Sequence, residues 1–268
     1  MSNHSKEQRV LSVYEKQQLL KYGLSEKDFL KQGEMPVEYF TGFVDFAGLT
    51  LQVNQQVLIP RVESEELVNQ ALHFVKKCQK NKLKVLEIAT GSGAIALALI
   101  NKIQRLNYLN KNWEFCLTEL SASAMSLAKN NYQKLLAKVV NQDKIEVKFV
   151  LSNLLNQIKD EQKFDLVLAN LPYIPSQDLK KLDPSVKNFE PLLALDGGET
   201  GFELIAKALE QLLKKNLLVK NACLIFETNY THQEQFVKNH YPSLLEKFKI
   251  KFIKDQFDRQ RFLQLQRI

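Results

Sequence analysis

The sequence lacks the signs of a disulfide-bonded or metal-binding protein. Its three cysteines, Cys78, Cys116 and Cys223, lie far apart, and the last two fall within apolar runs typical of strands. Cysteines of this kind behave as small buried apolar side chains in a reducing compartment. The four histidines show no metal-ligand spacing, so we expect no metal site.

Long apolar runs are also absent. No stretch approaches the roughly 18 consecutive apolar residues that indicate a membrane-spanning helix. The start, Met1-Ser2-Asn3-His4-Ser5-Lys6, does not resemble a signal peptide. We therefore expect a cytoplasmic protein that has no membrane partner.

The net charge leaves two interpretations open. The chain carries a formal charge of +7, and lysine far outnumbers arginine. This balance can attract an anionic partner such as RNA or a ribosome-bound factor, or it can be a solvated lysine-rich surface. Because no run of basic residues is interleaved with aromatics, nucleic acid is not expected as the substrate.

The chain divides into three predicted parts. Residues 1–38 show helical spacing of apolar residues and form a short N-terminal helical arm, too small to build a core alone. Residues 39–57 alternate around Gly48 and predict a β-hairpin linker, with strands at 39–43 and 49–53. Residues 58–268 form the main domain.

The main domain alternates strands with helices and predicts an α/β fold. Its last two strands follow each other directly, so a parallel sheet finished by an antiparallel hairpin is expected. The predicted strands are 84–88, 113–118, 145–150, 164–169, 222–227, 247–254 and 261–267.

A glycine-containing turn follows the first strand of this domain. Ala89-Thr90-Gly91-Ser92-Gly93 leads into an apolar helix, and glycines there let the backbone approach a nucleotide closely. Glu119 ends the second strand, where an acidic residue can accept hydrogen bonds from ribose hydroxyls. The turn alone fits a nicotinamide site and an adenosyl-sulfonium site equally well.

A second turn, Asn170-Leu171-Pro172-Tyr173, follows the buried fourth strand. It falls at a carboxyl strand end, where open α/β sheets bind ligands. The Asn170 amide oxygen and a rigid backbone carbonyl are acceptors that can hold both hydrogens of a planar –NH2 group, while the tyrosine ring packs on its face. Taken alone, the stretch could also be only a strand end with a proline turn. Beside the glycine turn, it favours methyl transfer to nitrogen over hydride transfer.

Two further stretches are candidates for the site. Arg61 and Glu63 precede a helix and are placed to line it, whereas Glu65 and Glu66 suit a helix N-terminus. The loop 174–200 is long for a compact domain, so we expect it to cover the substrate.

With these residues placed, residues 36–268 resemble the release factor glutamine methyltransferases, the PrmC/HemK family. The Asn-Pro-Pro-Tyr type of turn is shared with N6-adenine methyltransferases, whereas the stretches 58–68 and 189–198 favour a protein-glutamine substrate. The stretches that carry the resemblance are 58–68, 89–97, 170–175 and 189–198.

The resemblance implies a class I methyltransferase fold, Rossmann-like, with a seven-stranded and mostly parallel sheet behind an N-terminal helical domain. It implies S-adenosylmethionine as cofactor and the glutamine of the Gly-Gly-Gln loop of peptide chain release factors as substrate. By position, residues 89–93 would wrap the methionine part of the cofactor, and Glu119 would hold its ribose. Ser152 and Asn153 would lie near its adenine. Asn170 would also border the cofactor. The four residues from Asn170 to Tyr173 would clamp the glutamine amide. Arg61 would be a further substrate-binding residue.

The chemistry follows from charge. Acceptors at Asn170 and at the Leu171 carbonyl would favour an electron-rich nitrogen and stabilise the positive charge that develops on it. We expect no covalent intermediate and no dedicated general base. If the reaction does use a general base, Glu63 is the candidate, provided that its side chain reaches the site.

The sequence departs from the family pattern at three places. Leu171 replaces the first proline of the turn, Glu87 and Ala89 replace the usual aspartate and glycine, and the arm is short. Alternative functions are an N6-adenine nucleic-acid methyltransferase, a non-catalytic binding protein with this fold, and an NAD enzyme.

Overall fold

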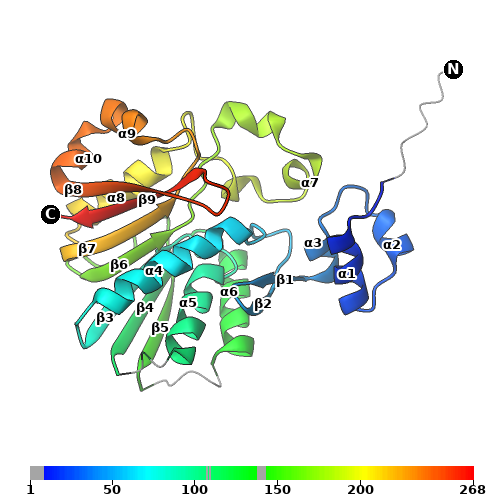
Figure 1. The fold of residues 1–268 in the computed structure, drawn as a ribbon, viewed down its shortest axis with the longest axis horizontal. Coiled ribbons are helices and arrows are strands. Elements are labelled where there is room, and N and C mark those ends of the chain that lie inside the picture. The colour runs from blue at the N-terminus through cyan, green and yellow to red at the C-terminus, as the bar shows by residue number, and fades with distance from the viewer. Residues whose placement is uncertain (1–8, 107, 109, 138–142) are drawn as a thin grey trace.

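The computed structural model describes residues 9–106, 108, 110–137 and 143–268. Residues 1–8, which begin the predicted arm, lie outside the described residues. Figure 1 shows a large body of sheet and helices, with a small helical arm extending to one side. A two-stranded hairpin joins the two parts.

A seven-stranded sheet forms the centre of the body, in the order β5-β4-β3-β6-β7-β9-β8. Strands β3 to β7 pair in parallel, and β9 runs antiparallel to both β7 and β8. The predicted sheet of seven strands with an antiparallel end is confirmed. The strands are β3 Lys82–Ile88, β4 Asn112–Glu119, β5 Ile145–Leu151, β6 Phe164–Ala169, β7 Leu218–Glu227, β8 Phe248–Lys254 and β9 Gln260–Arg267.

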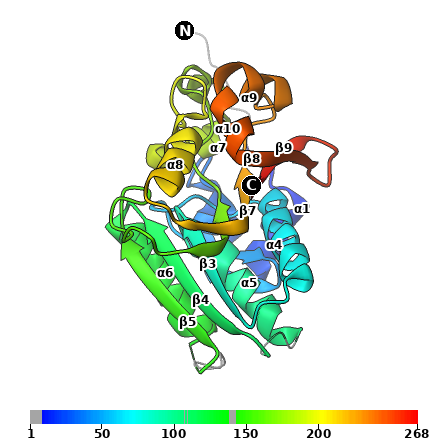
Figure 2. The same cartoon turned by 90° about the vertical axis from the view of Figure 1, so that its left-hand side faces the viewer.

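Helices cover both faces of this sheet, because successive residues of the central strands are apolar on both sides. Val85 and Ile225 pack with α4, α5 and α6 on one face, whereas Leu86 and Leu224 pack with α8, α9 and α10 on the other. Figure 2 shows α4 and α8 on opposite sides of the sheet. The helices are α4 Glu65–Lys77, α5 Ala94–Arg105, α6 Ala122–Leu135, α8 Glu203–Lys214, α9 Glu234–His240 and α10 Pro242–Lys247.

The arm has a small core of its own. Its helices are α1 Val13–Lys21, α2 Glu26–Leu30 and α3 Val37–Thr41. They bury a cluster made of Leu11, Leu19, Phe29 and Val37. Ser25 caps α2 by accepting from the Asp28 backbone N–H at 3.3 Å.

The hairpin linker is shorter than predicted. Its strands are β1 Phe43–Phe46 and β2 Leu49–Gln52, so the prediction of a strand from Tyr39 was wrong. Residues 37–41 form α3 instead, because Pro36 suits a helix start and Gly42 ends the helix at a φ of +79°. The predicted boundary between residues 38 and 39 falls inside α3, and the division into three domains stays a prediction.

The remaining segments are short helical turns around the sheet edge. They are η1 Val62–Ser64, η2 Ser176–Lys181, α7 Pro184–Lys187 and η3 Leu192–Ala194. Three of them lie in the predicted 174–200 loop, which passes above the carboxyl ends of the strands. Across the described ranges, no helix is long and apolar enough to cross a membrane.

Candidate active site

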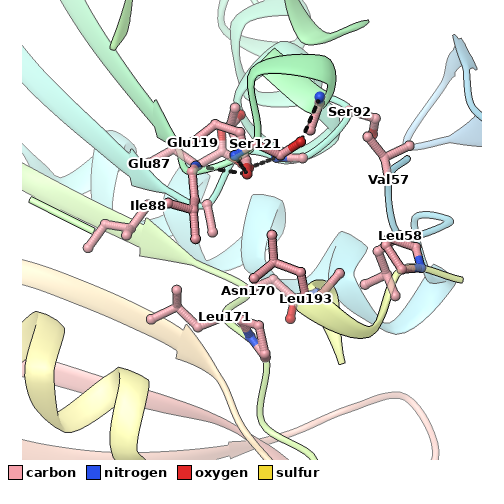
Figure 3. A pocket seen from close by; sticks show the side chains of 18 of the residues that line it. Val57, Leu58, Glu87, Ile88, Ser92, Glu119, Ser121, Asn170, Leu171 and Leu193 are labelled. Atoms are coloured by element: carbon pink, nitrogen blue, oxygen red, sulfur yellow. Dashed lines mark hydrogen bonds between the residues drawn. The ribbon is translucent and has the colours of Figure 1, made fainter. Parts of the chain in front are cut away.

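A pocket of about 800 Å³ lies at the carboxyl ends of the parallel strands. Figure 3 shows Glu119 and Ser92 on one wall and Asn170 with Leu193 on the facing side. Of the residues predicted for the site, Gly93, Tyr173 and Arg61 are not among those that line the pocket. The predicted residues that do line it are Ala89, Thr90, Gly91, Ser92, Glu119, Asn153, Asn170, Leu171 and Pro172.

The glycine turn after β3 is held by hydrogen bonds to its own backbone and to β4. Thr90 N–H donates to the Thr118 carbonyl at 2.9 Å, and Gly93 N–H donates to the Thr90 carbonyl at 2.8 Å. Gly93 then leads into α5 at a φ of +86°, a conformation that favours glycine. Gly93 therefore serves the turn itself, which explains why it does not line the pocket.

The turn is also tied to the hairpin linker through Asn131 of α6. The Asn131 amide donates to the Ser92 carbonyl at 2.9 Å and to the Gln52 carbonyl at 3.0 Å. Its oxygen accepts from the Gln52 N–H at 2.9 Å. One buried side chain thus joins β2 to the pocket wall.

Ala89 adopts a left-handed conformation, with a φ of +59°. An L-residue with a Cβ is strained there, by about 1–2 kcal/mol. This is the position where the sequence departs from the glycine of the family pattern. The turn keeps its glycine-like geometry at Ala89 and stores the strain locally.

Glu119 presents a carboxylate that the backbone holds in place. Oε2 accepts from Gly91 N–H, and Oε1 accepts from Leu120 and Ser121 N–H, each at 2.9 Å. A carboxylate offers about four lone-pair sites. Glu119 therefore retains capacity for a hydroxyl donor on the pocket side.

Glu87 is a buried acid that sequence reasoning named only as a departure from the family. It lines the pocket and accepts from the Thr90 hydroxyl at 2.7 Å. Burial raises the pKa of Glu87 to about 8, although the Thr90 hydrogen bond opposes this rise. Burial therefore favours the neutral form of Glu87, which places less negative charge beside the glycine turn.

Asn170 projects from the end of β6 and is oriented by a serine. Its Nδ2 donates to Ser64 Oγ at 3.1 Å, and Ser64 Oγ donates to Glu227 Oε2 at 2.6 Å. In the described part of the chain, no group donates to Asn170 Oδ1 or to the Leu171 carbonyl. Both acceptors are thus left for a ligand.

Tyr173 points to the network behind the pocket. Its hydroxyl donates to Glu227 Oε1 at 3.0 Å and accepts from Arg261 Nη2 at 3.0 Å. The Arg261 guanidinium lies 5.5 Å from the centre of the Tyr173 ring. Burial raises the pKa of Tyr173 far above its usual range. Tyr173 anchors the turn in this arrangement, and its part as a lid over substrate stays a prediction.

The turn is braced by the loop that contains Gly197. Ile174 N–H donates to the Leu195 carbonyl at 3.1 Å, and Gly197 N–H donates to the Ile174 carbonyl at 2.9 Å. A Cβ at Gly197 would lie 2.7 Å from the Pro172 carbonyl oxygen and 2.8 Å from Tyr173 Cα. Only glycine fits this approach. The paired glycines at 197 and 198 were the sequence signal for it.

Arg61 pairs with a buried acid instead of facing the pocket. Its guanidinium donates to Glu190, whose side chain is 1% exposed. Residues 191–194, directly after Glu190, form part of the pocket wall. Arg61 thereby positions this wall, and its direct contact with substrate stays a prediction. Glu63 does not line the pocket either.

No group of three histidine, cysteine, aspartate or glutamate side chains could hold a metal ion in the ranges that the structure describes. The pocket instead combines backbone groups of the glycine turn with three carboxyl and three carboxamide side chains: Glu87, Glu119 and Asp196, and Gln56, Asn153 and Asn170. These groups suit a nucleoside-bearing ligand beside a second, amide-like one.

Known proteins with this sequence pattern are methyltransferases. A family model described as a methyltransferase domain matches residues 79–257. A release factor glutamine methyltransferase from Bacillus cereus is 37% identical over 72% of this chain and 63% of that protein. The one from Staphylococcus aureus is 30% identical over 90% of this chain and 78% of that protein.

Solved structures share the fold at low sequence identity. The hMettl16 catalytic domain, in complex with a MAT2A 3'UTR hairpin, has a TM-score of 0.56 at 19% identity, over 82% of this chain and 75% of that one. A methyltransferase from Pyrococcus furiosus has a TM-score of 0.52 at 16% identity, over 82% and 89%. These likenesses show the fold alone.

The fold and the family model define a class I methyltransferase domain, as the sequence predicted. Within that class, the chain belongs to the release factor glutamine methyltransferase family. The aligned region spans 63% of the Bacillus cereus relative and 66% of the Lactococcus lactis relative.

Replacing Ala89 with glycine is expected to stabilise the protein. The change removes the left-handed strain, and the extra freedom of the unfolded glycine offsets part of the gain, leaving about 0.5–1 kcal/mol. Urea unfolding measures the free energy. As a control, Ala206→Gly within α8 should instead cost about 1 kcal/mol. A loss of stability in Ala89→Gly would contradict the strain.

Replacing Gly197 with alanine is expected to lower the free energy of unfolding by about 1–3 kcal/mol, because the added methyl group meets backbone atoms of the Asn170 turn. Urea unfolding again gives the value. Gly197 is not in a left-handed conformation, so its loss comes from the clash alone, whereas Gly23→Ala, where a Cβ meets nothing within 4 Å, gives the cost of a left-handed alanine without a clash. Wild-type stability in Gly197→Ala would show that the loop yields freely.

Proposed function

We propose that this protein transfers a methyl group from S-adenosylmethionine to the glutamine side chain of the Gly-Gly-Gln loop in peptide chain release factors. The observation that carries the proposal is one pocket that joins the glycine turn after β3 to the Asn170 turn after β6. The relatives' names support the same substrate class.

The residues present fit S-adenosylmethionine, which supplies a methyl group on a positively charged sulfur. Residues 89–93 would hold the methionine part through backbone groups at a turn that permits close approach. Glu119 would accept from a ribose hydroxyl with its remaining lone pair, because three backbone N–H groups fix the carboxylate. Ser152 and Asn153, on the wall beyond β5, would border the adenine.

The second half of the pocket fits a primary carboxamide. Asn170 Oδ1 and the Leu171 carbonyl would accept the two hydrogens of the glutamine –NH2 group. These acceptors favour an electron-rich nitrogen and stabilise the positive charge that develops on it, in a site where they are already oriented. Correct positioning of the two reactants supplies much of the remaining rate.

Leu171 stands where the family's turn has a proline, and the packing of its side chain supports a fixed position for the Leu171 carbonyl. The Leu171 side chain is 2% exposed and packs in the core under α8. Burial of an apolar side chain of this size contributes about 1.5–3 kcal/mol. Core packing thus restrains the backbone at Leu171 where a proline ring would fix one dihedral angle.

An adenine N6-methyltransferase would use the same pair of acceptors on a flipped base, which normally stacks on aromatic side chains. Phe46 is the sole aromatic residue in the described lining of this pocket. A flipped base would thus find one aromatic ring to stack on in the described lining, which favours a carboxamide as the methyl acceptor.

The substrate is tested with purified protein and labelled S-adenosylmethionine. Three acceptors are compared: a peptide chain release factor, the same factor with its loop glutamine changed to asparagine, and RNA. Label on the unchanged factor alone is the expected result. Label on RNA alone, or equal label on both factors, would refute the glutamine assignment.

Asn170→Ala is expected to lower kcat by about 10²–10³-fold, because it removes a preorganised acceptor beside the reacting nitrogen. Cofactor affinity, measured by calorimetry with S-adenosylhomocysteine, should stay within a few-fold, since in this proposal the lost acceptor faces the glutamine nitrogen. Asn239→Ala, at an exposed position of α9, is the matched control. Equal losses of turnover and cofactor affinity would show that Asn170 serves the cofactor instead.

A further inference from the structure

A chain of hydrogen bonds leads from the pocket wall into the interior, and only its first member, Asn170, takes part directly in the proposed chemistry. It runs from Asn170 through Ser64 to Glu227, which also contacts Tyr173 and Arg261. We propose that Ser64, ordered by Glu227, is a positioning residue that fixes which end of the Asn170 amide faces the substrate. The inference rests on the proposed function and deepens it.

The direction of each hydrogen bond follows from the chemistry of the groups. A serine hydroxyl has one hydrogen, and an ionised carboxylate can only accept. Because Ser64 gives its hydrogen to Glu227 at 2.6 Å, Ser64 Oγ can only accept from Asn170 at 3.1 Å. Nδ2 must therefore face Ser64, and Oδ1 is left as the free end.

An amide turned the other way would present two N–H donors to the substrate's own –NH2 group. Two donors repel each other there, and the acceptor of the clamp would be lost. Both orientations have the same shape, so packing alone does not distinguish them. The order of hydrogen bonds from Glu227 is what distinguishes them.

Glu227 is held firmly enough to impose this order. Its side chain is fully buried, and its other oxygen accepts from the Tyr173 hydroxyl at 3.0 Å and from Arg261 at 3.3 Å. The partners come from η1, from the turn after β6 and from β9. The carboxylate is therefore fixed by three elements that meet behind the pocket.

The protonation state of Glu227 enters the same argument. Burial raises the pKa of Glu227, while Ser64, Arg261 and Tyr173 oppose the rise and Glu63 adds to it. A protonated Glu227 can donate to Ser64, which then can donate to Asn170 and stabilise the turned amide. Orientation is thus kept above the pKa of Glu227 and lost as the pH falls through it.

Ser64→Ala tests the proposal in the full-length protein, with release factor and S-adenosylmethionine. Without the serine acceptor the amide turns freely, so kcat should fall about 10²-fold, the size of a positioning defect. Cofactor affinity should stay within a few-fold. Ser64→Thr, which retains the hydroxyl, should recover most of the rate, and Ser126→Ala on the exposed face of α6 should match wild type.

A double-mutant cycle separates positioning from a general structural role. In an Asn170→Ala background, Ser64→Ala should have no further effect on kcat, because Ser64 acts through the Asn170 amide. If Ser64→Ala does not fold, Ser64→Cys fills the same space with a weaker donor and replaces it in the cycle. If the double variant instead loses kcat by the product of the two single losses, the two residues act independently and the proposal is overturned.

The pH profile gives a second readout. Wild-type kcat should fall as the pH is lowered, and this fall should begin at a pH above the ordinary carboxyl range. Glu227→Gln should be slow at every pH and should lack this fall. If the wild type is active on release factor and Ser64→Ala has the same kcat, this inference is overturned and the proposed function is not. A wild type that is inactive on release factor would overturn the proposed function and this inference together.

Discussion

The register of three parallel strands determines where the pocket forms. Ile88 of β3 pairs with Thr118 of β4 and with Ala169 of β6. The next residue along each strand therefore lies at the same edge of the sheet: Ala89, Glu119 and Asn170. Because parallel strands all present their carboxyl ends at this edge, three turns that are distant in sequence meet around one cavity. A shift of one residue in either pairing would separate them.

The pocket also shows how exposed chemistry depends on buried polar groups. Asn131 joins the hairpin to the glycine turn, Glu190 holds Arg61, and Glu227 collects Ser64, Tyr173 and Arg261. Burial of such groups is costly unless each donor and acceptor has a partner. Here the partners come from different elements, so the same bonds that satisfy the buried groups also locate the pocket walls.

The strands, the two turns and the acid at the end of β4 could be predicted from the sequence, because each has a local pattern of apolar residues, glycine or proline. The residues that hold those turns through hydrogen bonds and ion pairs could not be predicted from it. Ser64 and Glu227 are 163 residues apart, and Arg61 and Glu190 are 129 apart, so no local spacing marks either pair. The strand expected from Tyr39 was wrong because alternating aromatic residues fit a short helix as well when Pro36 and Gly42 bound it.

The pocket lining draws on residues as distant as Phe46 and Lys207. A chain that emerges from the ribosome therefore has no complete pocket until it has been made and has folded at least as far as Lys207. A ligand that binds only the finished pocket stabilises the whole molecule by mass action. Incomplete or misfolded copies gain nothing from it, so ligand occupancy discriminates between mature molecules and defective ones.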